Sequence, residues 1–211
     1  MYVLTNPVYG EDYNEGYVFF SYTMNSLVSS GIALFQELDN VCGVQLSHCG
    51  IISGPEMCVE STTPVVMESN FIEKYVNEPH TVVFLRKPLH WNAGGAKAMI
   101  AEVRKDLGMK YSYTGIAGSA LLLLLTWGFR FLPFLRYYKN PLNRDDEMFC
   151  SELVAEGMVV LEGKTGCLKY HPTNIYPVTL FQDNLIWQPW NPRIVEEKMA
   201  QGRILVPGPS V

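Results

Sequence analysis

The sequence lacks several features that would assign it to a common functional class. Its 211 residues carry a net charge of −5, and a chain without an excess of basic residues has no electrostatic footprint for binding nucleic acid. Its five cysteines, at positions 42, 49, 58, 150 and 167, form no CxxC pair. An odd number of cysteines without paired spacing argues against a disulfide framework and against zinc binding. We therefore expect no metal, no cofactor and a reducing compartment.

The N-terminus also lacks the basic segment and apolar run of a secretory signal. The chain has no internal repeat and no low-complexity tract, and it is long enough to bury a sizeable core. We expect a single domain over residues 1–211, in the cytoplasm or at the periphery of a membrane.

Hydrophobic patterns predict a mixture of short strands and helices. An aromatic strand is expected within residues 14–22, and a helix within 24–39. Four short strands are expected between residues 47 and 87, as an antiparallel meander. Helices are expected at 94–108 and from position 150 onward, and the proline-rich arm at about 171–211 is expected to cross the surface as strand and loop. These elements predict an α+β fold with helices against a small antiparallel sheet.

One apolar segment, GIAGSALLLLLTWGFRFLPFLRYYK at residues 115–139, stands apart from the rest of the chain. It has no charge from Gly115 to Phe129. As a helix, this uncharged stretch would be roughly 22 Å long, which is shorter than the ~30 Å hydrocarbon core of a bilayer. A transmembrane span is therefore the least supported interpretation. A buried helix, or an apolar flap that contacts a lipid, a membrane surface or a partner, remains open, since aromatic residues and arginines at its end suit an interface.

Cys150 lies where an amphipathic helix is predicted to begin. A thiol at a helix N-terminus is stabilised as the thiolate by the helix dipole and free backbone N–H groups, although a buried cysteine is also an ordinary core residue. His48 begins one predicted strand and Glu60 lies in the next. Pairing of these strands would bring the two side chains to cross-strand distance, about 5 Å between Cβ atoms. A thiolate, a histidine base and a carboxylate that orients the base form a nucleophilic triad.

Other polar and aromatic residues have plainer interpretations. Glu68, one strand later, is an alternative to Glu60, and Glu152 is expected to cap the helix or form an ion pair in its first turn. Cys49 should point to the opposite face of the strand from His48, into the core. The remaining residues of this kind are expected at the surface (His80, His90 and His171) or in packing of the C-terminal arm (Trp187 and Trp190).

At these motifs the chain resembles the papain-like hydrolases of the NlpC/p60 type, in the circularly permuted order of the YiiX-like group. The family's S-H-x-G-I strand is matched at residues 47–51, its hydrophobic-E-[AS] strand at 59–61, and its [FY]-C-S-E-L-V helix start at 149–154. Its G-x-x-Y-x-Y pattern is matched by Gly108, Tyr111 and Tyr113, and its late proline-containing tail by residues 172–180. The usual Gly-Asp turn near the start is replaced by Glu15-Gly16-Tyr17.

The resemblance implies a helical part that holds Cys150, packed on a small barrel-like sheet that holds His48 and Glu60. It implies hydrolysis of an amide or related acyl bond, with the backbone N–H of Cys150 and a tyrosine, Tyr111 or Tyr113, binding the oxyanion. We expect an amidase or peptidase acting on a peptide, for instance a peptidoglycan stem peptide. A lipid ester hydrolase or acyltransferase with the same triad, favoured by the apolar segment, and a non-catalytic binding protein remain alternatives, and the oligomeric state stays open.

Overall fold

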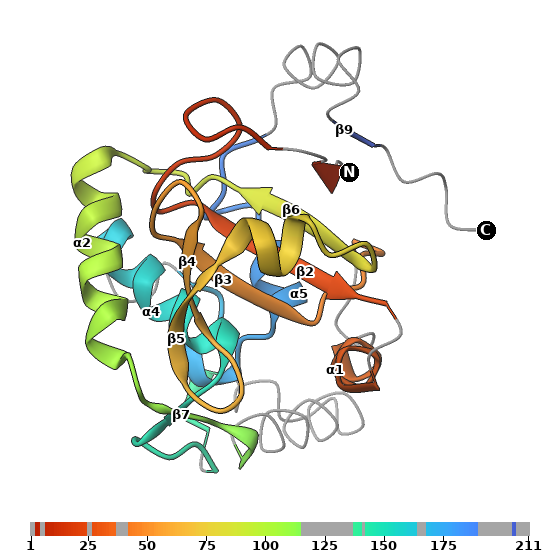
Figure 1. Cartoon of the computed structure of the whole chain (residues 1–211). Helices are drawn as coiled ribbons and strands as arrows, with labels where there is room; N and C mark the ends of the chain where they lie inside the picture. Colours follow the sequence, from red (N-terminus) through yellow and green to blue (C-terminus); the bar gives the residue numbers. More distant parts are fainter. Residues whose placement is uncertain are drawn as a thin grey trace.

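A five-stranded antiparallel sheet forms the centre of the computed structural model, with the strand order β5-β4-β3-β2-β6 (Figure 1). The model describes residues 3–4, 7–24, 27–36, 42–114, 137–140, 142–163, 168–189 and 204–205. The strands of this sheet are β2 (Val18–Thr23), β3 (His48–Ile52), β4 (Met57–Ser61), β5 (Val66–Asn70) and β6 (Thr81–Arg86). With helices packed beside the sheet, the fold belongs to the α+β class, as predicted.

The expected four-stranded meander is wrong at its last strand. Strands β3, β4 and β5 follow one another as neighbours, but β6 pairs with β2 at the opposite edge of the sheet. A short π-helix, η2 (Ile72–Val76), lies between β5 and β6 in the sequence and crosses one face of the sheet (Figure 1). The local pattern of apolar residues predicts that a strand forms, but not which strand pairs with it.

The two faces of the sheet bury different clusters. One face packs against α2 (Ala93–Val103), which continues into the 3-10 helix η3 (Arg104–Asp106), and against α4 (Cys150–Glu162). Gly157 lets α4 approach closely, because a Cβ there would lie 2.8 Å from Ile51 and 3.1 Å from Met99. The other face holds a smaller aromatic cluster that includes Phe19, Phe71 and Tyr75 of η2. The helices predicted at residues 94–108 and from Cys150 onward are thus present, with α2 slightly shorter than expected.

The first part of the C-terminal arm is buried, which corrects the expected surface path of strand and loop. It forms the 3-10 helix η5 (Pro172–Asn174) and the short helix α5 (Pro177–Phe181). Val178 and Leu180 are each only 1% exposed, and Trp187 donates its Nε1–H to the carbonyl of Leu180 at 2.7 Å. Pro172 and Pro177 do not send the chain outward, because each occupies the first turn of a short helix, where the missing N–H costs no hydrogen bond.

The remaining elements are short or lie at the edge of the molecule. Helix α1 (Leu27–Gln36), within the predicted 24–39, is held through Gln36, whose Nε2 donates to the Leu46 carbonyl and whose Oε1 accepts the backbone N–H of Val178. Two small pairings complete the fold: β1 (Val3–Leu4) with β9 (Ile204–Leu205), and β7 (Lys110–Tyr111) with β8 (Glu147–Met148).

Most of the apolar segment at 115–139 lies outside the described residues, as does Trp190; only Tyr137 to Lys139 of the segment are included. Within the described part of the chain, no helix has both the length and the apolar character needed to cross a membrane.

Candidate active site

Cys150 is the first residue of α4, as the sequence predicts. The preceding residue, Phe149, has extended backbone geometry and accepts the first helical hydrogen bond from the N–H of Leu153 at 3.2 Å. The carboxyl group of Glu152, in the first turn of α4, interacts with the backbone N–H of Phe149 and accepts a hydrogen bond from Asn143 Nδ2 at 2.8 Å. Helix α4 ends at Gly163 in the left-handed conformation. The Cys150 side chain therefore lies at the N-terminal end of a capped helix, where backbone N–H groups have no partner within the helix.

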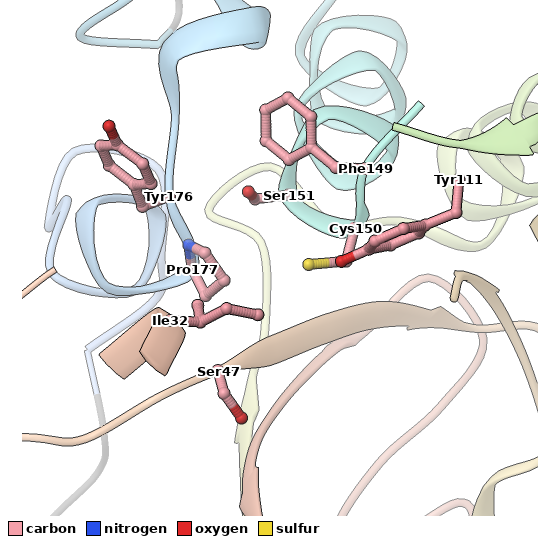
Figure 2. A pocket seen from close by; sticks show the side chains of 8 residues that line it. All are labelled: Ile32, Ser47, Tyr111, Phe149, Cys150, Ser151, Tyr176 and Pro177. Atoms are coloured by element: carbon pink, nitrogen blue, oxygen red, sulfur yellow. The ribbon is translucent and has the colours of Figure 1, made fainter. Parts of the chain in front are cut away.

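The carbonyl of Met148 fixes the chain that leads into α4. It accepts the hydroxyl of Ser61, at the end of β4, at 2.7 Å and the backbone N–H of Ser112 at 3.0 Å. The parallel pairing of β7 with β8 aligns Tyr111 with Met148. These bonds connect Met148 both to the central sheet and to the segment before the apolar insert. Tyr111 consequently lies beside Cys150 (Figure 2).

His48 and Glu60 are in contact. Strands β3 and β4 pair antiparallel through Ile51↔Val59 and Ile52↔Cys58, and His48 Nε2 lies 2.7 Å from Glu60 Oε2. The predicted hairpin therefore brings the two side chains together. The imidazole remains partly exposed, with 17% of its side chain accessible, while the Glu60 side chain is fully buried.

Two residues that the sequence interpretation missed complete the environment of Glu60. Lys74 Nζ donates to Glu60 Oε1 at 2.6 Å, and the Tyr75 hydroxyl donates to Oε2. The Tyr75 ring also stacks on the imidazole of His48, with ring centroids 5.6 Å apart and planes 12° apart. Both residues lie on the π-helix η2, a segment without a recognisable catalytic pattern, so no local signal in the sequence marked them.

The electrostatics of the site favour a charged pair. Burial opposes a charge on His48, but its hydrogen bonds with Cys150 and Glu60 outweigh that effect and raise the pKa of His48 to about 9. Burial also opposes a charge on Glu60, yet its contacts with His48 and Lys74 hold the pKa of that carboxyl far below its usual range. The pKa of Cys150 is lowered, first by a hydrogen bond with Cys49 and, against the effect of burial, by the imidazole of His48. At neutral pH these directions favour a thiolate, an imidazolium and a carboxylate.

Cys49 is fully buried, as predicted, but it also contacts the nucleophile candidate. Burial and the neighbouring Cys150 raise the pKa of Cys49 well above its ordinary value. Cys49 therefore stays a neutral thiol that can donate a hydrogen bond to the Cys150 thiolate. Alternation along β3 predicts that Cys49 faces the helices. Only the tertiary structure shows that α4 begins directly over Cys49.

A cleft with two unlike compartments surrounds these residues. The larger compartment, about 480 Å³, includes His48, Lys74, Tyr75 and Tyr113 in its lining and is otherwise dominated by serine and threonine side chains (Ser21, Thr23, Ser29, Ser47, Thr62, Thr63 and Thr81). The smaller one, about 20 Å³, is lined by Cys150 and by mainly apolar neighbours (Ile32, Ser47, Tyr111, Phe149, Ser151, Tyr176 and Pro177). Figure 2 shows the sulfur of Cys150 directed into this smaller space.

The two tyrosines expected near the oxyanion differ in position. Tyr111 lines both compartments, and burial raises its pKa, so it remains a neutral hydroxyl that can donate. Tyr113 is 60% exposed and its hydroxyl is 2.7 Å from that of Thr63. Tyr113 therefore lines only the larger compartment and does not reach the one that holds Cys150.

The other candidates lie elsewhere. Glu68 accepts hydrogen bonds from Ser53 and Arg104 and is not in contact with His48 in the described hydrogen bonds. His80 and His90 are exposed and His171 is half-buried, while Trp187 packs in the core as expected. Within the described residues, no group of three histidine, cysteine or acidic side chains could hold a metal ion.

A scan against models of protein families finds no match to this chain, and a search of curated proteins finds no significant match.

Proposed function

We propose that this protein is a cysteine hydrolase of the permuted papain-like type, in which Cys150 is the nucleophile, His48 the general base and acid, and Glu60 the residue that orients the imidazole. One observation supports this most: a buried carboxylate, Glu60, is hydrogen-bonded to a partly exposed imidazole, His48, which interacts with a cysteine at the N-terminus of a helix. The order of the chain, with the histidine strand before the cysteine helix, agrees with the circularly permuted NlpC/p60 arrangement of the YiiX-like group.

The proposed reaction is transfer of an acyl group to Cys150 and then to water. The thiolate attacks the carbonyl carbon, a C–S bond forms, and the oxyanion is held by the backbone N–H of Cys150 with the Tyr111 hydroxyl. The bond from the carbonyl carbon to the leaving group breaks as the imidazolium of His48 gives that group its proton. A water molecule then gives a proton to His48 and attacks the thioester, releasing the acid and restoring Cys150.

Tyr75 and Lys74 act as positioning residues in this scheme. A fully buried carboxylate is costly unless each oxygen has partners, and Glu60 has Lys74 on one oxygen and both His48 and Tyr75 on the other. The Nε2 of His48 is thus committed to Glu60, which leaves Nδ1 for the thiol. An ionised, fully partnered Glu60 keeps the imidazole protonated, ready to donate to the leaving group.

The preferred substrate is an amide bond of a peptide, because the motifs at 47–51, 59–61 and 149–154 resemble those of the YiiX-like group. Serine and threonine hydroxyl groups in the compartment beside His48 can bond the polar groups of a peptide, within a lining that is otherwise largely apolar. A lipid ester hydrolase or acyltransferase remains the second candidate because of the apolar segment at 115–139. A non-catalytic binding protein is the third, although such a protein would not need the triad.

The first test is the pH dependence of iodoacetamide labelling at each cysteine, followed by mass spectrometry. We expect Cys150 to be labelled rapidly below pH 7, because the thiolate pairs with the imidazolium, and we expect His48→Ala to move that reactivity to a pH at least one unit higher. Cys58, whose pKa burial raises, serves as the internal control. If Cys150 is labelled no faster than Cys58, or if His48→Ala has no effect, the proposed charged pair does not exist and the non-catalytic alternative becomes the better one.

A further inference from the structure

A second thiol lies against the sulfur of Cys150. Cys49 is on β3, where alternation turns its side chain to the face of the sheet opposite His48, and α4 packs on that face. Both cysteines belong to the same core cluster, with Cys49 fully buried and Cys150 only 4% exposed, and their side chains are hydrogen-bonded to each other. The fold therefore brings together two free thiols from distant parts of the chain.

The other described cysteines are placed differently. Cys58 lies on β4 but belongs to the aromatic cluster on the other face of the sheet, and its Sγ donates to the carbonyl of Ser69 at 3.6 Å. Cys42 precedes β3, is only partly buried, and packs against the core. Of the cysteines that the structure describes, Cys49 is thus the one hydrogen-bonded to Cys150.

The two thiols of this pair differ in charge. The hydrogen bond from Cys49 and the imidazole of His48 lower the pKa of Cys150, whereas burial and the charge of Cys150 raise the pKa of Cys49. Peroxides oxidise the thiolate form of a cysteine, and a neutral thiol is inert by comparison. Oxidation of this pair therefore begins at Cys150.

The cleft gives a small oxidant access to Cys150 but not to Cys49. Figure 2 shows the sulfur of Cys150 directed into the smaller compartment. This compartment adjoins the larger one beside His48, since Ile32, Ser47 and Tyr111 line both. Cys49 lines neither compartment. The group that Cys49 meets is consequently an oxidised Cys150 and not free peroxide.

We propose that Cys49 is the resolving thiol of a peroxide-dependent switch, in which it reacts with oxidised Cys150 to form a reversible Cys49–Cys150 disulfide. The disulfide blocks the nucleophile and keeps it from becoming a sulfinic or sulfonic acid, which thiols do not reduce. This inference goes beyond the proposed function, because it requires only a reactive thiolate at Cys150 and no particular substrate.

The first step consumes one molecule of hydrogen peroxide. The Cys150 thiolate attacks one oxygen, an S–O bond forms and the O–O bond breaks, and the departing hydroxide takes a proton from the imidazolium of His48 and leaves as water. The product is a sulfenic acid at Cys150. This step also removes the negative charge of Cys150, one of the causes that raise the pKa of Cys49, so Cys49 becomes a better nucleophile.

The second step joins the two sulfur atoms. The sulfur of Cys49 attacks the sulfenic sulfur of Cys150, an S–S bond forms, and the S–O bond breaks as the hydroxyl group leaves with the proton of Cys49 as water. Together the two thiols lose two electrons, and the peroxide is reduced to two molecules of water. A thiol reductant reverses the result by exchange with the disulfide.

The test treats the reduced, full-length protein with hydrogen peroxide in the absence of other thiols. Intact-mass measurement and peptide mapping without reduction follow the products. We expect the mass to fall by that of the two thiol hydrogens, a cross-linked Cys49–Cys150 peptide to appear, and iodoacetamide labelling of Cys150 to be lost. Dithiothreitol should restore most of that labelling. A Cys150 that ends as a sulfinic acid, or that pairs with a different cysteine, would overturn the proposal.

Two serine variants show whether Cys49 protects the nucleophile, each compared with its own untreated sample. Cys49→Ser keeps a hydrogen-bond donor but cannot form the disulfide, so Cys150 should pass through a sulfenic acid that dimedone traps and end as a sulfinic acid. Dithiothreitol should then restore several-fold less labelling than in wild type. Cys58→Ser replaces a buried cysteine of the neighbouring strand in the other cluster and should recover like wild type. Equal recovery of Cys49→Ser and wild type would overturn the role of Cys49.

Failure of the switch and failure of the proposed function give different results. If iodoacetamide labels Cys150 rapidly but peroxide forms no disulfide with Cys49, the thiolate exists and only the switch is overturned. If the disulfide forms in a protein that hydrolyses neither amides nor esters, the switch stands and the hydrolase assignment fails.

Discussion

At the scale of single residues, the nucleophile candidate has two partners of unlike character. His48 supplies a positive charge, and Cys49 supplies a neutral thiol that lies in the same buried cluster as Cys150. A thiolate in a buried site is stabilised by hydrogen bonds to its charged form as well as by opposite charge. Cys49 therefore contributes to the low pKa of Cys150 although it takes no part in proton transfer.

Removing the Cys49 thiol should make Cys150 less reactive without disturbing the triad. We expect Cys49→Ala to raise the pH midpoint of iodoacetamide labelling at Cys150 by about one unit, since a hydrogen bond to the thiolate is lost. Cys49→Ser keeps a donor and should restore most of the shift. Cys58→Ala, a buried cysteine of the neighbouring strand in the other cluster, is the matched control. Equal midpoints for Cys49→Ala and Cys58→Ala would show that Cys49 is only a packing residue.

At the scale of elements, the hairpin of β3 and β4 sets the geometry of the base. Gly50 lies in this hairpin, two residues from His48, and the ring of Phe19 occupies the space where a side chain would be. A Cβ at Gly50 would lie 2.6 Å from the Phe19 ring and 2.9 Å from the carbonyl of Val59. The carbonyl belongs to the paired strand, so it cannot move without disturbing the ladder that carries Glu60.

Substitution at Gly50 should therefore affect both stability and the site. We expect Gly50→Ala to lower the free energy of unfolding by about 1–3 kcal/mol, the usual cost of overpacking, and to slow the labelling of Cys150 at pH 6. Gly54→Ala, in the turn of the same hairpin, meets its nearest atom at 3.8 Å and should change stability by less than about 0.5 kcal/mol. Urea unfolding of both variants is the measurement, and similar values for the two would contradict this account of the hairpin.

At the scale of the whole molecule, a buried carboxyl makes stability depend on pH. Burial and the nearby Glu156 raise the pKa of Glu152 to about 8, despite its hydrogen bonds with Phe149 and Asn143. The favourable field of the helix N-terminus is worth about 1 kcal/mol, which is smaller than the cost of burying the charge. Glu152 is therefore protonated in the folded protein at neutral pH, whereas in the unfolded chain it ionises near its ordinary value of 4.5.

The raised pKa of Glu152 fixes the direction in which the stability of the protein changes with pH. The folded state binds the proton more tightly, so this contribution to stability is complete below pH 4.5 and is lost as pH rises toward 8. Between pH 5 and pH 8, wild type should lose on the order of 3 kcal/mol relative to Glu152→Gln. The comparison cancels the contributions of His48 and Glu60, which both proteins share. Parallel pH profiles of unfolding for the two proteins would show that Glu152 is ionised in the fold.

The sequence by itself determined the elements and the three triad candidates, because these depend on local patterns. Short runs bounded by Gly54-Pro55 and Thr63-Pro64 predict β3 and β4. Helical spacing predicts α4, and the position of Cys150 at its start follows from the same spacing. The contact of His48 with Glu60 also follows from a hairpin between consecutive strands. Local spacing carries this information since strand and helix periods are properties of the backbone.

Only the tertiary structure decided which distant residues surround that triad. Lys74 and Tyr75, which bind Glu60, lie on a π-helix that no sequence pattern predicts. Strand β6 pairs with β2 rather than with β5, the strand before it in sequence, because the chain crosses the sheet between them. The smaller compartment of the cleft lies where Ile32 of α1 and Pro177 of α5 come together beside Cys150. The physical reason is that elements pack together where their shapes are complementary and bury a large area. This complementarity depends on the whole fold and produces no periodic pattern in the sequence.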